Sequence, residues 1–210
     1  MREVVVVSGV RTAIGTYGGS LKDTPPTELA AQVVRESLAR AGVEGKDVGH
    51  VVFGHVLNTE PKDMYLSRVA AINGGCVEGT PAFNVNRLCG SGLQAIVSAS
   101  QAIMLGDCDI AIGGGAENMS RGPYASLSAR WGARMGDSKM VDMVVGALHA
   151  HSTPSIWVSP LKTLPLNTAS PVKCKMPWQY KAITVHSVQQ KQVTLKTKSR
   201  QSCSRAKKAK

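Results

Sequence analysis

The last 62 residues of this 210-residue chain lack two kinds of residue: they contain no acidic residue and no glycine. All 14 Asp and Glu residues and all 21 glycines lie in the first 148 residues, together with 13 of the 25 Lys and Arg residues. The first 148 residues therefore carry a net charge of −1, and the overall charge of +11 comes from the tail. A body of this charge gives no reason to expect attraction to nucleic acid or to an anionic membrane.

The tail also lacks a sustained helical or strand period. From about residue 149 it is rich in Pro, Ser, Thr, Gln and Lys, with no helix or hairpin that carries its own caps. Such a composition buries too little apolar surface to offset the entropy of ordering the chain. We therefore expect residues 150–210 to form a disordered basic tail.

The sequence has no continuous apolar run of the roughly 18 residues that a membrane-spanning helix needs. The N-terminal "MREVVVVSGVRT" is too short an apolar region for a signal peptide and lacks a suitable cleavage site. The five cysteines are odd in number, widely spaced and form no CxxC; they are Cys76, Cys89, Cys108, Cys174 and Cys203. We therefore expect no membrane span, no disulfide framework, no metal site, and a reduced, cytoplasmic setting.

The first 148 residues alternate strand-like and helix-like segments. Short apolar runs predict strands at 3–11, 50–58, 82–88 and 108–117, and helical patterns lie at 24–42, 63–75 and 90–107. This alternation predicts an α/β domain with helices packed on a mixed sheet. The segment 90–107 is apolar or small nearly all round, so we expect it to be a buried helix.

Cys89 lies in "NRLCGSGLQAI", directly before a predicted helix. A thiol with its ordinary pKa of about 8.5 is a weak nucleophile, and the positive end of a helix favours the thiolate. Gly90 and Gly92 would allow a substrate or another helix to approach closely. Two interpretations stay open from this spacing: an activated nucleophile, or a small buried apolar residue.

Three stretches resemble the thiolases, which include the acetyl-CoA C-acyltransferases (β-ketothiolases). They are "VVVVSGVRTAIGTYGGSLKD", "NRLCGSGLQAIVSASQAIMLGDCDIAIGGGAENMSRGPY" and "RWGARMGDSKMVDMVVGAL". The resemblance covers about residues 1–149. It implies a thiolase N-terminal core at 1–120 and the start of the loop region that covers the site at 121–149.

The resemblance implies that Cys89 takes an acyl group from acyl-CoA as a thioester, in thiolytic cleavage or Claisen condensation. It places Leu148 near the acyl and pantetheine pocket. Coenzyme A thioesters are then substrates, and no cofactor is implied. Members of this family are often homo-oligomers.

Other catalytic motifs of the family are missing from this sequence. A full thiolase is about twice as long and carries an "NEAF" asparagine, a "GHP" histidine and a "CxGGG" cysteine, none of which occurs here. Back-translation of "SIWVSPLKT" and "VTLKTKS" in a shifted frame gives "HMGVTAEN" and "YFKDQI", which resemble later thiolase segments. We therefore expect a truncated, inactive chain whose tail after about codon 149 arose from a one-nucleotide frameshift.

An alternative is a repurposed thiolase-like body whose basic tail binds nucleic acid or an anionic membrane. Trp157, Trp178 and Tyr180 could stack on bases in that case. A random basic tail would give only nonspecific attraction, so we expect no specific nucleic-acid partner.

Several further residues have structural interpretations. We expect Cys76 and Cys108 to be structural thiols. His50 and His55 have no metal-ligand partners at suitable spacing, which predicts core or surface histidines. The glycines of "GGGAE" at 113–117 do not fit a dinucleotide-binding fingerprint and are expected to permit close packing near the site.

Overall fold

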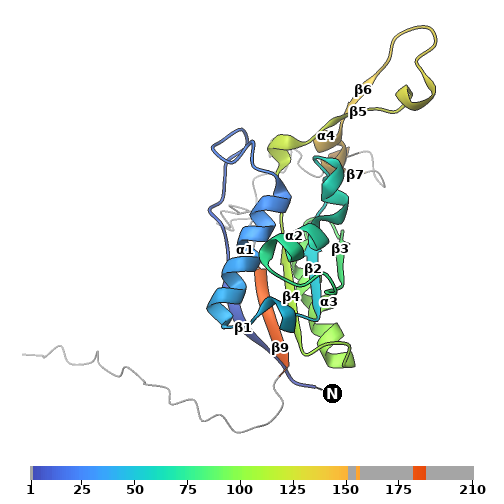
Figure 1. Ribbon diagram of the computed structural model, residues 1–210. Coiled ribbons are helices and arrows are strands. Elements are labelled where there is room, and N and C mark those ends of the chain that lie inside the picture. Colours follow the sequence, from blue (N-terminus) through green and yellow to red (C-terminus); the bar gives the residue numbers. More distant parts are fainter. Residues whose placement is uncertain (1, 151–154, 157–181, 188–210) are drawn as a thin grey trace, which may run out of the picture.

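The computed structural model describes residues 2–150, 155–156 and 182–187. A five-stranded sheet lies at its centre, with the strand order β1-β9-β4-β2-β3. Its strands are β1 (Val4–Val10), β2 (His50–Gly54), β3 (Ala82–Val85), β4 (Ile110–Gly115) and β9 (Ala182–Ser187). Strand β2 pairs in parallel with β3 and β4, and β9 pairs antiparallel with β1 and β4. The predicted mixed sheet of an α/β domain is confirmed (Figure 1).

Helices cover both faces of this sheet. They are α1 (Pro26–Ala41), α2 (Leu66–Gly74) and α3 (Ser91–Leu105). Helices α1 and α2 lie side by side on one face, and α3 lies on the other (Figure 1). The period of two in the strands divides the core accordingly: Val51 and Phe53 pack with α1 and α2, while Val52 packs with α3.

Helix α1 begins and ends as its sequence predicts. Pro26 occupies the first helical position, where its missing N–H costs nothing, and Glu28 lies in the positive first turn. Gly42 ends the helix with φ 64°, and its N–H donates to the carbonyl of Ala39. The prediction for 24–42 is confirmed to within two residues at the N-terminal end.

Helix α3 differs from its prediction in one respect. Only Ser91, Ala95, Ala99 and Ile103 are buried, and they form one stripe against the sheet. Leu93 and Leu105 on other faces are 69% and 80% exposed. The prediction of a helix buried all round is wrong, because within the described residues only the sheet covers α3.

The segment Leu88–Leu105 is long and apolar enough to cross a membrane by length and composition, with a mean hydropathy of 1.3. Small residues are interspersed among its apolar ones, so this average arises without a continuous apolar run. In the fold this segment packs on β2 and β4. The expectation that the protein contacts no membrane stays a prediction.

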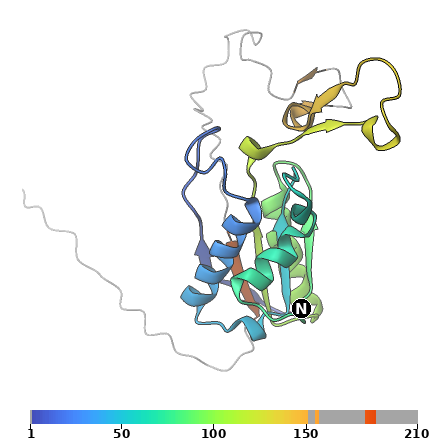
Figure 2. The same ribbon diagram turned by 45° about the horizontal axis from the view of Figure 1, so that its top comes forward.

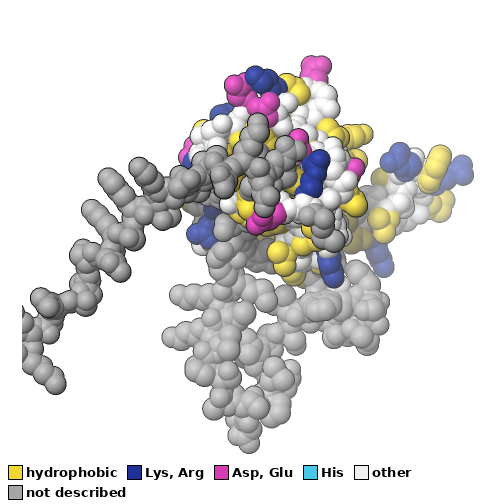
Figure 3. All heavy atoms as spheres, turned by 90° about the horizontal axis from the view of Figure 1, so that it is seen from below, with side chains coloured by type: hydrophobic (Ala, Val, Ile, Leu, Met, Phe, Trp, Pro, Cys, Tyr) yellow, Lys and Arg dark blue, Asp and Glu magenta, His cyan; other side chains and the backbone are white. Residues whose placement is uncertain are grey.

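A smaller region projects from the sheet domain beyond residue 121 (Figure 2). It contains β5 (Tyr124–Ser126), β6 (Met140–Asp142), α4 (Met143–Leu148), β7 (His149–Ala150) and β8 (Ser155–Ile156). Strands β5 and β6 form an antiparallel pair, and the Asp142 carboxylate accepts the Val144 and Val145 N–H groups at the start of α4. The connection between β5 and β6 exposes Leu127, Trp131 and Met135, and Figure 3 shows hydrophobic and basic side chains on this projection.

Short 3-10 turns link these elements: η1 (Gly45–Asp47), η2 (Pro61–Tyr65), η3 (Met119–Arg121) and η4 (Ala129–Trp131). The two that matter for the site are η2, which follows β2 and leads into α2, and η3, which follows β4. Both lie at the carboxyl end of the parallel strands, where α/β proteins place their functional loops.

One part of the tail is a strand, although its composition predicts no regular structure. Residues 182–187, "AITVHS", pair with both β1 and β4 and thereby join β1 to the rest of the sheet. The β-branched residues at 183–185 favour a strand once neighbours on both sides pair with the backbone. Trp157, Trp178 and Tyr180, which the nucleic-acid alternative invokes, lie outside the described residues, as do Cys174 and Cys203.

Candidate active site

Cys89 lies in a tight turn between β3 and α3. Leu88 has φ 48°, the left-handed conformation that a residue with a branched side chain adopts only when the surroundings impose it. Its N–H donates to the side-chain oxygen of Asn86 at 3.0 Å, and its carbonyl accepts the Ser91 N–H at 3.0 Å. The turn leaves Cys89 exposed to solvent with a free thiol. The interpretation of Cys89 as a small buried residue is wrong, because the turn presents its side chain outward.

Ser91 fixes this turn from the buried side. Its hydroxyl accepts the Arg87 N–H at 2.8 Å and donates to the Leu88 carbonyl at 2.6 Å, and the residue is 5% exposed. Gly90 precedes the helix and supplies no side-chain cap. Cys89 therefore lies beside the unpaired N–H groups and positive end of α3, which is the surrounding that the sequence predicted for a nucleophile.

Glycines allow α3 to lie directly on the ends of β2 and β4. A side chain at Gly54 would collide with the backbone of Ser91 and Gly92 in the first turn of α3. An added Cβ at Gly115 would lie 3.3 Å from the Gly92 Cα, and one at Gly113 would lie 2.7 Å from the Ile96 Cα. The prediction that the "GGGAE" glycines permit close packing near the site is confirmed.

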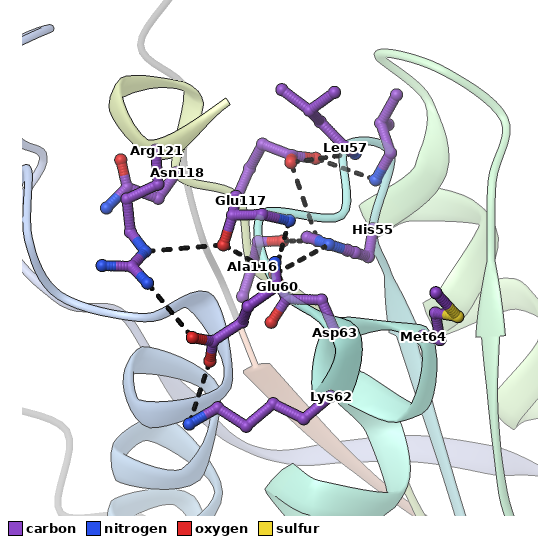
Figure 4. Close-up of polar contacts among 12 residues, drawn as sticks. His55, Leu57, Glu60, Lys62, Asp63, Met64, Ala116, Glu117, Asn118 and Arg121 are labelled. Atoms are coloured by element: carbon purple, nitrogen blue, oxygen red, sulfur yellow. Dashed lines mark hydrogen bonds and ion pairs between the residues drawn. The ribbon is translucent and has the colours of Figure 1, made fainter. Parts of the chain in front are cut away.

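A buried polar network lies at the same edge of the sheet (Figure 4). The Nδ1 of His55 contacts the Ala116 carbonyl at 2.8 Å and lies 3.6 Å from the Glu117 Oε1, and its Nε2 lies 4.0 Å from the Asp63 Oδ2. Glu117 accepts the N–H groups of Val56 and Leu57 at 2.9 and 3.1 Å. Because a carbonyl only accepts, His55 donates through Nδ1.

Charge and burial oppose one another at Glu117. Burial raises the pKa of its carboxyl above the ordinary value, while the His55 imidazole and the Val56 and Leu57 N–H groups lower it and the Asp63 carboxylate raises it further. Burial is the largest of these effects. Burial therefore opposes the ionisation of Glu117, while its hydrogen bonds and His55 favour the carboxylate.

The segment that follows β4 also binds two neighbouring loops. The Asn118 amide donates to the Leu21, Lys22 and Thr24 carbonyls at 2.9, 3.2 and 2.8 Å. Ser120 accepts the Gly18 N–H at 2.9 Å. A half-open cavity of about 160 Å³ lies between these segments, lined by residues 14–17, Leu21, Leu29 and residues 117–120.

Arg121 connects this segment to η2. Its guanidinium donates to the Asp23 carbonyl at 2.9 Å and to the Glu60 carboxylate at 3.1 Å. Glu60 also pairs with Lys62 at 2.9 Å. Glu60 and Asp63 together form a capping box at the start of η2. The Glu60 side chain accepts the backbone N–H of Asp63, and the Asp63 side chain accepts the backbone N–H of Glu60.

The sequence predicted His55 only as a core or surface histidine, and the structure places it in the core, 5% exposed. The network around it was missed, because its members come from residues 55–63 and 116–121, which only the pairing of β2 with β4 brings together. The one available signal was "AENMSR", a polar run that directly follows a buried strand. Among the residues that the structure describes, no group of three His, Cys, Asp or Glu side chains could hold a metal ion.

The remaining predicted residues take the following places. Leu148 is the last residue of α4 and is half-buried, and its part in an acyl pocket stays a prediction. Cys76 and Cys108 are buried, as structural thiols should be. Burial raises the pKa of Cys76 to about 11 and also raises that of Cys108. His50 packs its ring on Phe83, with centroids 5.4 Å apart, and burial lowers its pKa while Asp107 raises it.

Comparison with known proteins shows the family that the residues around Cys89 resemble. The family described as "Thiolase, N-terminal domain" matches residues 4–155. "Beta-ketothiolase BktB" of Cupriavidus necator is 74% identical over 148 residues, which are 70% of this chain and 38% of the relative. An acetyl-CoA acetyltransferase of the same organism is 46% identical over 145 residues, or 69% of this chain and 37% of the relative.

Solved structures agree. The acetyl-CoA acetyltransferase of Bacillus anthracis superposes with a TM-score of 0.71 at 36% identity, over 75% of this chain and 40% of that one. Human mitochondrial 3-ketoacyl-CoA thiolase in complex with CoA gives 0.72 at 35% identity, over 74% and 40%. The protein is thus an α/β chain with the fold of a thiolase N-terminal domain. It belongs to the thiolase family, and it spans about two fifths of the length of the relatives it matches.

Proposed function

We propose that Cys89 accepts an acyl group from acyl-CoA, which is the first half of a thiolase reaction. The Cys89 thiolate attacks the thioester carbonyl, a new bond forms between its sulfur and the acyl carbon, and coenzyme A leaves as its thiolate. One thioester replaces another, so the step needs no oxidant and no cofactor. Cleavage of a 3-ketoacyl-CoA would load Cys89 in the same way, with an acetyl-CoA carbanion as the leaving group.

The observation that carries this proposal is the exposed thiol of Cys89 in a strained turn at the positive end of α3. Backbone strain stored at an exposed nucleophile is typical of functional sites. The N–H groups at the start of α3 favour negative charge, both on the attacking sulfur and on an oxygen of the tetrahedral intermediate. The names of the similar proteins support the substrate class, because they act on or bind acyl-CoA and CoA.

We also propose that this chain forms the thioester slowly and does not complete turnover. Within the described residues, the Cys89 thiol has no hydrogen bond to an imidazole or carboxylate that could take its proton. His55 is buried and donates to the Ala116 carbonyl, so it is not directed at the thiol. The second half-reaction requires a further acid or base. The missing "GHP" and "CxGGG" motifs are consistent with its absence.

The experiment is intact-mass spectrometry of the full chain after incubation with acetyl-CoA. We expect a single acetyl adduct on Cys89, mapped by peptide digestion, and no adduct at that position in Cys89→Ser. Released coenzyme A, measured with a thiol reagent, should stop at one equivalent per chain. An adduct confined to other cysteines would contradict the assignment, and continuous release would contradict the absence of turnover.

The frameshift hypothesis has its own test in the nucleotide sequence across codons 140–165. We expect the alternative frame to encode "HMGVTAEN" within codons 155–163. An alternative frame without thiolase sequence would overturn the hypothesis.

A further inference from the structure

The backbone of residues 55–57 lies between the Cys89 turn and α4, which carries Leu148, the residue predicted to lie near the acyl pocket. On one side, Gly54 supports the first turn of α3 beside Cys89, and its carbonyl accepts the Ala116 N–H at 3.1 Å. On the other side, the side chains of Leu57 and of Val144 in α4 both lie against Gly122. This short segment therefore neighbours both the first turn of α3 and α4, which ends at Leu148.

One side chain binds the backbone of this segment at two successive residues. The Glu117 carboxylate binds two successive backbone N–H groups, with Oε2 on Val56 at 2.9 Å and Oε1 on Leu57 at 3.1 Å. Its side chain is 11% exposed, so water competes little for these bonds. Hydrogen bonds to an ionised acceptor are about twice as strong as neutral ones. An uncharged amide at this position would present a donor to one of the two N–H groups and lose that bond.

In the part of the chain that the structure describes, titratable groups near Glu117 lie after β2, in η2 and in η3. After β2, the His55 imidazole lies 3.6 Å from the Glu117 Oε1. From η2, the Asp63 carboxylate lies beyond His55 and accepts the Thr59 and Glu60 N–H groups at 2.7 and 3.1 Å. From η3, Arg121 pairs with Glu60, which also pairs with Lys62, so these charges are largely satisfied away from Glu117 (Figure 4).

We propose that Glu117 is a positioning residue for acyl transfer to Cys89: its carboxylate holds the backbone of residues 55–57 in the place where the Cys89 turn and α4 together receive the acyl chain. This inference rests on the proposed function. It adds a residue that touches neither the thiol nor the acyl group and acts through the backbone of Val56 and Leu57.

A pH profile follows from the same geometry. Burial raises the pKa of Glu117, so the carboxyl takes up a proton at a higher pH than an exposed glutamate does. The protonated form carries an O–H donor on one of the two oxygens that accept Val56 and Leu57. Positioning is therefore complete above the raised pKa and is lost as the pH falls through it.

The test compares two reactions of the same thiol in the full-length chain. Thioester formation with acetyl-CoA depends on positioning, whereas alkylation by iodoacetamide depends on the thiolate and its exposure. We measure the ratio of the two rates at Cys89 between about pH 5 and pH 8. We expect the wild-type ratio to fall on the acid side, and the Glu117→Gln ratio to be roughly tenfold lower at neutral pH and independent of pH.

The matched control is Glu78→Gln, which makes the same chemical change at an exposed glutamate. Its ratio and pH profile should equal those of the wild type. A Glu117→Gln ratio equal to the wild-type ratio at neutral pH would overturn the proposal. If Glu117→Gln does not fold, as seen by circular dichroism, the wild-type profile decides, and a ratio without an acid-side fall overturns the proposal.

A second measurement separates this inference from the proposed function. Hydrogen–deuterium exchange at the Val56 and Leu57 amides should be at least several-fold faster in Glu117→Gln than in Glu78→Gln. Unchanged exchange would show that Glu117 does not hold the segment. If the wild type forms no thioester at all, the proposed function fails, and the exchange result alone decides whether Glu117 positions residues 55–57.

Discussion

Helix α1 and helix α3 lie on opposite faces of the same sheet and differ in how many of their residues are buried. Helix α1 buries nine of its 16 residues and exposes a polar face with Arg40 and Glu36 paired at 2.6 Å. Helix α3 has no charged residue, buries four of its 15, and leaves Leu93, Val97 and Leu105 exposed. Among the described residues, the α1 face is therefore covered by a polar helix surface, while the α3 face exposes apolar side chains on the helix that begins beside the exposed Cys89 thiol.

The largest expected difference concerns the thiols on the two faces. Cys76 packs with α1 and α2, Cys108 packs with α3, and Cys89 is exposed at the edge. With its pKa raised to about 11, roughly one Cys76 thiol in a thousand is ionised at pH 8. Iodoacetamide should therefore modify Cys89 far faster than Cys76 or Cys108, as measured by peptide mass spectrometry.

The control for this labelling is Cys89→Ser, in which Cys76 and Cys108 should remain slow to react. Raising the pH should accelerate their labelling, because each raised pKa leaves the unreactive thiol form dominant at neutral pH. Equal labelling rates at Cys89 and Cys108 would mean that helix α3 moves away from the sheet readily. The two faces would then differ in how easily they open.

The next effect tests how closely α3 lies on the sheet. Gly54→Ala should lower the free energy of unfolding by about 1–3 kcal/mol, because the new methyl group collides with the backbone of Ser91 and Gly92. Gly92→Ala has open space and is the matched control; it should be neutral or raise stability by up to about 1 kcal/mol. Urea denaturation measures both. If Gly54→Ala changes the free energy of unfolding as little as Gly92→Ala does, α3 can move away from the strands.

A pair of valines compares the two helices directly. Val34 of α1 is fully buried, and Val34→Ala should cost roughly 2 kcal/mol through lost apolar burial and a new cavity. Val97 of α3 is 42% exposed, and Val97→Ala should change stability by less than about 0.5 kcal/mol. Thermal and urea unfolding measure the difference. A large cost at Val97 would mean that this face is covered in solution.

The smallest expected effect is the pH dependence of stability that Glu117 contributes at the edge between the two faces. Its folded-state pKa is raised, so the native state binds the proton more tightly than the unfolded state. Its contribution is therefore present below the ordinary value of 4.5 and is lost as the pH rises through the raised pKa. Glu117→Gln should remove this fall from the curve of unfolding free energy against pH.

Glu78→Gln should leave that curve unchanged. A steeper fall in Glu117→Gln would contradict the assignment of this pH dependence to Glu117. At neutral pH the carboxylate of Glu117 thus costs stability through burial while it holds Val56 and Leu57, as expected for a residue kept for positioning.

Local sequence features were sufficient for much of the fold. Pro26 and Gly42 delimit α1, because one residue lacks an N–H and the other tolerates positive φ. Alternation of strand-like and helix-like segments predicted the mixed sheet, and the residues around Cys89 predicted a thiol at a helix start. These features depend on neighbours in the chain, so a pattern of residues is enough to predict them.

Contacts between distant segments could not be predicted in the same way. The apolar composition of α3 indicated a buried helix, but burial depends on what lies against each face, and only the sheet does so here. The strand at 182–187 forms because β1 and β4 leave a place between them for its backbone, which its own polar and basic surroundings do not indicate.

By itself the sequence determined the α/β class, the ends of α1, the family and the place of the Cys89 thiol before a helix, since each depends on residues adjacent in the chain. Only the tertiary structure decided that Cys89 is exposed and that Glu117 binds the backbone beyond His55. The second property depends on the parallel pairing of β2 with β4, which places residues about 60 positions apart within hydrogen-bonding distance.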